Sequence, residues 1–160
     1  MSQGGRAVTS GNVLENCVEG TLQGHGYLQV GCDLARKQRL EYLLRPNNIP
    51  KRYARQVYIG PGIYGSDINV DFYIIGSGPV ASGLIIECKW QQTSGSVDEK
   101  LPYLNLNIQN CYPTQAMVLI DGGGAKPQAI SWLQTQVVSN QNLLAVFDLR
   151  GFITWSNNNL

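Results

Sequence analysis

The chain has 160 residues, of which 43% are hydrophobic and 14% are charged, and its formal net charge is +1. This length suits one domain with a single core, and the composition excludes a collagenous, coiled-coil or disordered protein. The longest apolar runs are far shorter than the roughly 20 residues of a membrane helix, and no signal-peptide pattern opens the chain. We therefore expect one domain over residues 1 to 160, located in the cytoplasm.

The first half of the chain is predicted to contain a helix, a basic segment and three strands. Ser10 can cap a helix that runs to Gly24, because apolar residues recur along it at steps of three and four. The basic segment follows and is expected to be partly helical over residues 34–44. Three strands then form an antiparallel meander, separated by turns that contain glycine and proline, at residues 54–59, 67–75 and 83–90.

The second half alternates helices with strands. Ser96 and Glu99 form a capping box that should open a helix. A strand at 116–120, a helix from about residue 127 and a strand at 143–147 follow, and residues 156–159 are expected to be a polar tail. The order α-β-β-β-α-β-α-β predicts an α/β fold, with a mixed sheet flanked by helices on both faces.

The second predicted strand carries two carboxylates in the alternation typical of a β-strand. From Asp67 to Ile74 the polar residues, Tyr73 included, are all odd-numbered and the apolar residues are all even-numbered. Successive side chains of a strand point to opposite faces. Asp67 and Asp71 should therefore project from the same face.

The third predicted strand adds a carboxylate and an ammonium, because its period places Glu87, Lys89 and Gln91 on one face. A carboxylate pair beside an ammonium can hold a hard divalent cation, while the lysine stabilises or helps to deprotonate an attacking water. Acid-x-Lys triplets also arise by chance on solvated strand faces. Here the strand begins with three apolar residues at 84–86, as a central strand does. Charged residues at the end of a central strand are not expected to be ordinary solvated surface residues.

With these residues the sequence resembles the PD-(D/E)XK nuclease superfamily, which includes many restriction enzymes, some homing endonucleases and Holliday-junction resolvases. The resemblance spans most of the chain and rests on an acidic first helix, a hairpin with Asp and then Glu-x-Lys, and a following helix and strand. Asp71 matches the Asp of the motif, Glu87 its second acid and Lys89 its lysine. Val70 stands where the family name expects proline, at a position that varies in the family.

This resemblance implies a Mg²⁺-dependent endodeoxyribonuclease of the restriction or homing type, which leaves 5′-phosphate and 3′-hydroxyl ends. Mn²⁺ should substitute for Mg²⁺, and Ca²⁺ should bind without supporting cleavage. Lys89 would steady the developing charge, while Gln91 and Glu15 would orient water. The implied metal ligands are Asp71, Glu87 and the backbone carbonyl of Cys88.

Several assignments stay open at this point. Asp67 could replace Asp71, although Asp71 is preferred because it opens the apolar arm of the hairpin. Glu15 fits the helix-borne acid better than Glu19, and a solvated helix face is the alternative for Glu15. The second enzymatic hypothesis is a structure-specific nuclease such as a junction resolvase. The hypothesis outside enzymes is a non-catalytic DNA-binding or assembly subunit with the nuclease fold.

A basic segment between Asp33 and Arg55 holds seven of the twelve basic residues and only two acids. Beside a nuclease site we expect it to contact DNA phosphates, although an ordinary soluble face has the same composition. One active site cuts one strand, so a homodimer or homotetramer, or a larger specificity subunit, should complete the assembly. The residues expected to contact DNA are Arg36, Lys37, Arg39, Lys51, Arg52 and Arg55.

Overall fold

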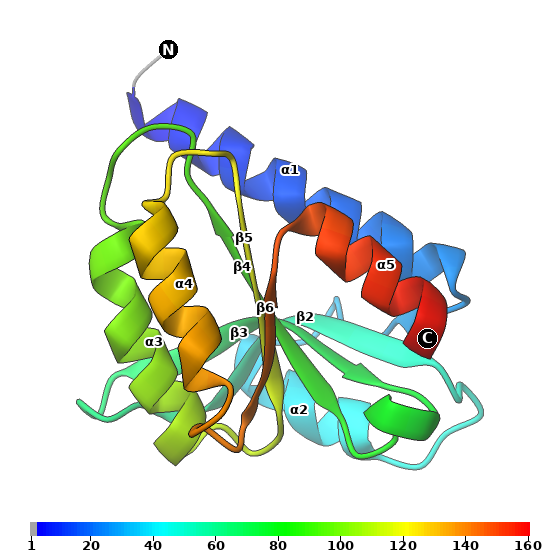
Figure 1. Cartoon of the computed structure of the whole chain (residues 1–160). Helices are drawn as coiled ribbons and strands as arrows, with labels where there is room; N and C mark the ends of the chain where they lie inside the picture. The colour runs from blue at the N-terminus through cyan, green and yellow to red at the C-terminus, as the bar shows by residue number, and fades with distance from the viewer. Residues whose placement is uncertain (1–2) are drawn as a thin grey trace.

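The computed structural model describes residues 3–160, with side chains from residue 13 onward, and shows a curled mixed sheet between two layers of helices (Figure 1). The strands lie side by side in chain order. β1 is parallel to β2, the pairs β2-β3 and β3-β4 are antiparallel, and β4, β5 and β6 are parallel. Their bounds are β1 Leu28–Gln29, β2 Arg52–Pro61, β3 Asp67–Ile75, β4 Leu84–Trp90, β5 Ala116–Asp121 and β6 Leu143–Phe147.

The helices cover the sheet on both faces and divide the core in two. The helices are α1 Gln3–Gly24, α2 Arg36–Leu44, α3 Val97–Cys111, α4 Pro127–Gln136 and α5 Leu149–Asn159, with a short 3₁₀ helix η1 at Gly78–Val80. Apolar residues of α1 and α5 pack on one face, with Phe72 and Ile86. Residues of α2, α3 and α4 pack on the other, with Val70 and Ile85. The predicted class, an α/β fold with a mixed sheet flanked by helices, is confirmed.

One predicted helix start is wrong, and the other is right in position but not in its capping contact. Ser10 does not open α1, because the backbone is already helical from Gln3. A capping residue marks where a helix can begin, and no proline between Gln3 and Ser10 prevents an earlier start. Ser96 precedes α3 but its side chain makes no cap hydrogen bond. The Val97 amide instead donates to Oε1 of Gln91 at 2.9 Å, so a residue from the end of the sheet caps this helix.

The predicted polar tail is also wrong, since residues 149–159 form α5. Asp148 caps this helix by accepting a 2.7 Å hydrogen bond from the Gly151 amide. The polar residues at its end share the helix with Phe152, which is fully buried in the core beside α1. A short two-residue strand, β1, was likewise not predicted.

The feature that creates a site is a fork between β3 and β4. The two strands pair at Ile74 with Leu84, Tyr73 with Ile85 and Phe72 with Ile86. Beyond Phe72, β3 stays paired with β2 and separates from β4, which continues to pair with β5 as far as Trp90. The residues just beyond the last pair, Asp71 on β3 and Glu87 on β4, therefore flank the opening of the fork.

The alternation of β3 breaks at Asp71. Val70 packs in the core on the α3 side, whereas Phe72 packs in the core on the α1 side, so the two residues do not share a face. Gln56 lies opposite Asp71 on β2 and has a positive φ of 50°, an uncommon backbone conformation for a residue other than glycine. The two aspartates therefore have different surroundings: Asp67 lies beside Lys37 of α2, whereas Asp71, at the irregular position, accepts a hydrogen bond from the Cys88 amide of β4.

Candidate active site

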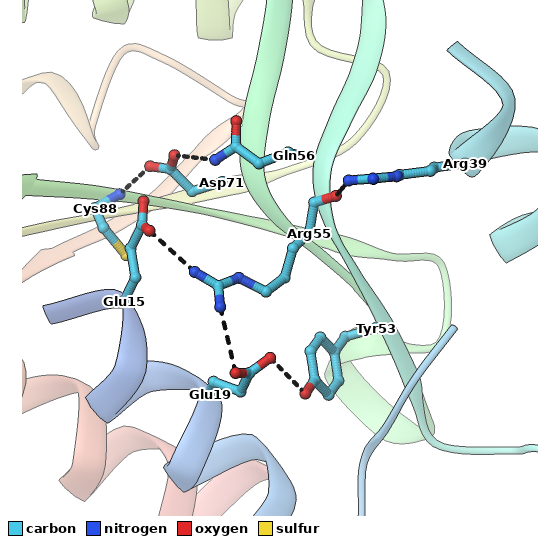
Figure 2. A network of polar contacts seen from close by, with 8 residues as sticks. All are labelled: Glu15, Glu19, Arg39, Tyr53, Arg55, Gln56, Asp71 and Cys88. Atoms are coloured by element: carbon cyan, nitrogen blue, oxygen red, sulfur yellow. Dashed lines mark hydrogen bonds and ion pairs between the residues drawn. The ribbon is translucent and has the colours of Figure 1, made fainter. Parts of the chain in front are cut away.

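Asp71 of β3 lies in the fork and accepts hydrogen bonds from both neighbouring strands, β4 and β2. Its Oδ2 accepts a 2.8 Å hydrogen bond from the Cys88 amide of β4, and its Oδ1 accepts one from Nε2 of Gln56 at 3.2 Å (Figure 2). Asp67 lies outside the fork, in the wall of a pocket beside Glu87 and Lys89, where its carboxylate is 55% exposed and 3.7 Å from Nζ of Lys37. These contacts favour Asp71 over Asp67 as the carboxylate that works together with β4.

Glu87 is a buried carboxylate on β4, only 4% exposed. The hydroxyl of Tyr112, which follows α3, donates to its Oε1 at 2.8 Å, and Nζ of Lys89 lies 3.9 Å from its Oε2. Burial, and next the negative charge of Asp71, raise the pKa of Glu87 to about 8, against the opposing effects of Lys89 and Tyr112. The raised pKa shows that a second negative charge beside Asp71 is costly in this buried place. A bound cation would remove that cost, so the Asp71 and Glu87 pair should attract one.

This buried carboxyl predicts a pH-dependent stability. A raised pKa in the folded state gives stability that is complete below the ordinary value of 4.5 and is lost as pH rises toward about 8. Glu87→Gln removes that loss, so without metal the variant should unfold at pH 8 with a free energy higher than the parent by roughly 1–3 kcal/mol. The difference should shrink toward pH 5.

Urea denaturation in EDTA at three pH values would measure this effect. The matched control is Glu41→Gln, since the Glu41 carboxylate is 76% exposed in a surface pair with Arg45. A parent that is more stable than Glu87→Gln at pH 8 would contradict the prediction.

The backbone of Cys88 faces the fork. The amides of Ile85 and Gln91 donate toward β5, whereas the Cys88 amide donates to Asp71 on the opposite side. The N–H and C=O of one strand residue point to the same neighbour, so the Cys88 carbonyl is directed at the fork as well. Burial raises the pKa of the Cys88 thiol well above its usual range, with the charge of Asp71 adding to the effect. The residue thus offers a carbonyl oxygen rather than a thiolate.

Glu15 of α1 approaches the fork from the other face of the sheet. Burial and then the charge of Asp71 raise the pKa of Glu15. Nη2 of Arg55 lies 3.0 Å from Oε2 of Glu15, and Nη1 of Arg55 lies 3.3 Å from Oε1 of Glu19 (Figure 2). The Tyr53 hydroxyl donates to Glu19 at 2.8 Å. The arrangement places Glu15, and not Glu19, next to Asp71.

The sequence analysis predicts that Gln91 orients water, but the structure places its side chain in a different role. Its side chain is 8% exposed and is occupied by backbone groups at both ends. Its Nε2 donates to the Gly124 carbonyl at 3.2 Å and its Oε1 accepts from the Val97 amide at 2.9 Å. Gly122 packs so closely on the Gln91 backbone that a Cβ there would lie 2.5 Å from its carbonyl oxygen. Gln91 joins the loop after β4 to the glycine-rich loop after β5.

Three of the six basic residues expected on DNA are engaged inside the protein. Arg52 is 8% exposed and donates to the carbonyls of Leu43, Ile49 and Arg45. Arg39 donates to three backbone carbonyls, one of them that of Arg55, and Arg55 pairs with the two α1 carboxylates. A guanidinium has five N–H donors, which suits it to join loops as well as to bind phosphate.

The remaining three basic residues lie nearer the surface. Arg36 is exposed, and the Lys37 side chain is 68% exposed beside Asp67. Lys51 is half-buried, and its Nζ donates to the His25 carbonyl at 3.1 Å. Arg36 and Lys37 are therefore the members of the basic segment best placed to meet a phosphate backbone.

The donor set of the fork fits a small, hard divalent cation. Two carboxylates and a backbone carbonyl are oxygen ligands, which Mg²⁺ accepts together with water. Within residues 13–160 no three His, Cys, Asp or Glu side chains gather closely enough to hold a metal by themselves. The fork therefore suits an ion that keeps several waters, as Mg²⁺ does, better than a structural zinc.

The comparisons with known proteins give one match. The family model described as "PD-(D/E)XK nuclease superfamily domain" matches residues 6–160, nearly the whole chain. No curated protein and no solved structure shows significant similarity to the chain. In residues 3–160 no helix combines the length and the apolar content needed to span a membrane.

Proposed function

Because the chain belongs to the PD-(D/E)XK nuclease superfamily, we propose that it is a Mg²⁺-dependent nuclease that hydrolyses phosphodiester bonds in DNA. The observation that carries the proposal is the meeting of Asp71, Glu87 and Lys89 at the fork between β3 and β4. Asp71 receives a hydrogen bond from the β4 backbone, and Lys89 lies beside the buried Glu87. Carboxylates that can hold a divalent cation, beside an ammonium that can stabilise a developing negative charge, suit metal-assisted phosphoryl hydrolysis.

Each side chain has a distinct part in the proposed reaction. Asp71 and Glu87, with the Cys88 carbonyl, would hold the cation, which when bound neutralises charge on the phosphate. Lys89 donates a hydrogen bond to a phosphate oxygen as negative charge develops. Glu15, held by Arg55, accepts a hydrogen bond from the attacking water and directs it in line with the bond that breaks.

The rest of the assembly follows from this proposal. Arg36 and Lys37 would contact the phosphate backbone without reading its sequence. A homodimer or homotetramer, or a larger specificity subunit, would supply the second site for cutting both strands. A restriction or homing type of activity is the first form of the proposal, and a structure-specific nuclease is the second.

The experiment is a cleavage assay on end-labelled single-stranded, duplex and four-way-junction DNA, with MgCl₂, CaCl₂ or EDTA. We expect cleavage in Mg²⁺, none in Ca²⁺ or EDTA, and products with 5′-phosphate and 3′-hydroxyl ends. A cut confined to the junction would favour the structure-specific form. DNA binding without cleavage in either Mg²⁺ or Mn²⁺ would instead indicate a non-catalytic subunit and contradict the proposal.

A further inference from the structure

A pocket of about 270 Å³ opens beside Glu87 and Lys89. Its remaining walls come from β3 and α3 and include Asn69, Lys100 and Tyr103. Pockets for drug-sized ligands typically have volumes of roughly 300–1,000 Å³, and this pocket lies just below the lower end of that range. It can therefore hold a small ligand, about as large as one nucleotide. A phosphate at the fork would lie beside Lys89, which also lines the pocket, so the neighbouring nucleotide would reach the entrance of the pocket.

One member of an aromatic pair, Tyr103, lines the pocket, and the other, Tyr64, stacks on it beside the pocket. Tyr64, in the turn between β2 and β3, stacks on Tyr103 of α3 with ring centroids 5.1 Å apart and planes inclined by 22°. Tyr64 is 79% exposed, which is unusual for so large a side chain and leaves one face of the pair open to solvent. A planar base can stack on such a face whatever its identity, because every base has a π-face.

The turn that carries Tyr64 is fixed to α3. The Ile63 amide donates to Oδ1 of Asn107 at 2.9 Å. Gly62 lies so close that a Cβ on it would be 2.9 Å from the same oxygen, so the absence of a side chain permits this contact. The aromatic pair is therefore held at a defined position relative to Glu87 and Lys89.

The polar groups of the pocket suit a nucleotide. Lys100 lines it, and the charge of Asp67 in its wall is balanced by Lys37 at 3.7 Å. Asn107 uses Oδ1 for the turn, while its Nδ2 has no hydrogen-bond partner among residues 13–160 and can donate to a ligand. Hydrogen-bond donors and a positive charge close to a stacking surface are the features used by proteins that bind single-stranded nucleic acid.

We propose that this pocket binds one unpaired nucleotide next to the bond that is cut, with its base stacked on the Tyr64 and Tyr103 pair. The inference rests on the proposed nuclease function and narrows its substrate class. A base in the pocket cannot stay stacked in a duplex, and removing it costs least where it is already unpaired or mismatched. The inference therefore favours single-stranded DNA, or a duplex with an unpaired nucleotide at the cut, and with it the structure-specific form of the proposed nuclease over the restriction or homing form.

The test measures binding in Ca²⁺, by fluorescence anisotropy of a labelled 12-nucleotide single strand and of the same strand in a duplex. Tyr64→Ala should weaken binding of the single strand about tenfold and change binding of the duplex by less than threefold. Tyr42→Ala is the control, since Tyr42 is an exposed tyrosine of α2 away from the pocket. It should leave both affinities unchanged.

Three outcomes would overturn the inference: a parent that does not bind the single strand, an equal loss on both DNAs, or no loss with Tyr64→Ala. A Tyr64→Ala variant that changes oligomeric state in gel filtration and keeps its affinity for the single strand would likewise overturn it, because the pair would then be a protein interface. Cleavage in Mg²⁺ on the same preparations separates the two proposals. Cleavage without selective stacking contradicts the pocket alone, and selective stacking without cleavage contradicts the nuclease alone.

Discussion

Asp71→Asn is expected to lower the rate of DNA cleavage by on the order of a thousandfold, with the fold intact. Asparagine keeps the size of the side chain and an oxygen that can accept the hydrogen bond from the Cys88 amide. It lacks the negative charge that attracts a divalent cation. The variant should therefore also bind Ca²⁺ more weakly. Single-turnover cleavage in Mg²⁺ and calorimetric titration with Ca²⁺ would measure the two effects.

Asp67→Asn is the matched control, four residues earlier on the same strand. Its carboxylate is more than half exposed, pairs with Lys37 and lines the pocket outside the fork, so we expect a loss of cleavage rate at least about tenfold smaller than that of Asp71→Asn. If Asp67→Asn were inactive and Asp71→Asn fully active, the metal would have to be reassigned to Asp67.

The class of fold could be predicted because periodicity and punctuation agree over most of the chain. The bounds of β3 and β6 match the predicted strands, and those of β4 differ by one residue. The last helix was missed because its end is rich in serine and asparagine, which are typical of loops. Burial of Phe152 against the core is a tertiary effect that outweighs this local preference.

Pattern and spacing named the residues that the structure brings together at the fork, but not their geometry. Glu87 and Lys89 share a face because β4 is regular. Asp71 reaches them because β3 changes face at this point, opposite the positive φ of Gln56. An alternating pattern of polar and apolar residues contains no sign of such a change: it placed Asp67 and Asp71 on one face, and Asp71 was preferred only because it opens the apolar arm of the hairpin.

Residues that act through tertiary contacts were missed or misassigned for the same reason. Tyr112 contacts Glu87 across 25 positions of sequence, and nothing in its local pattern marks it. Arg52 and Arg55 add to the positive charge of their segment. In the structure, however, Arg52 donates to backbone carbonyls and Arg55 pairs with the α1 carboxylates. Net charge counts side chains without showing which of them reach the surface.

Lys89→Met separates a catalytic lysine from a structural one. Its Nζ lies 3.9 Å from Oε2 of the buried Glu87, so Lys89→Met leaves that carboxyl without its counter-charge and can lower stability whether or not the lysine is catalytic. If Lys89 stabilises charge that appears only in the transition state, the variant should cleave DNA on the order of a hundredfold more slowly. Its affinity for DNA in Ca²⁺ should remain nearly that of the parent.

The control for this variant is Lys126→Met, which removes an exposed lysine from the loop between β5 and α4. It alters net charge by the same amount, so any general electrostatic effect on DNA binding should appear equally in both variants. Single-turnover rates and Ca²⁺ binding titrations on both proteins would distinguish the effects. A Lys89→Met rate within threefold of the parent would remove Lys89 from the mechanism and leave Asp71 and Glu87 to act through the metal alone.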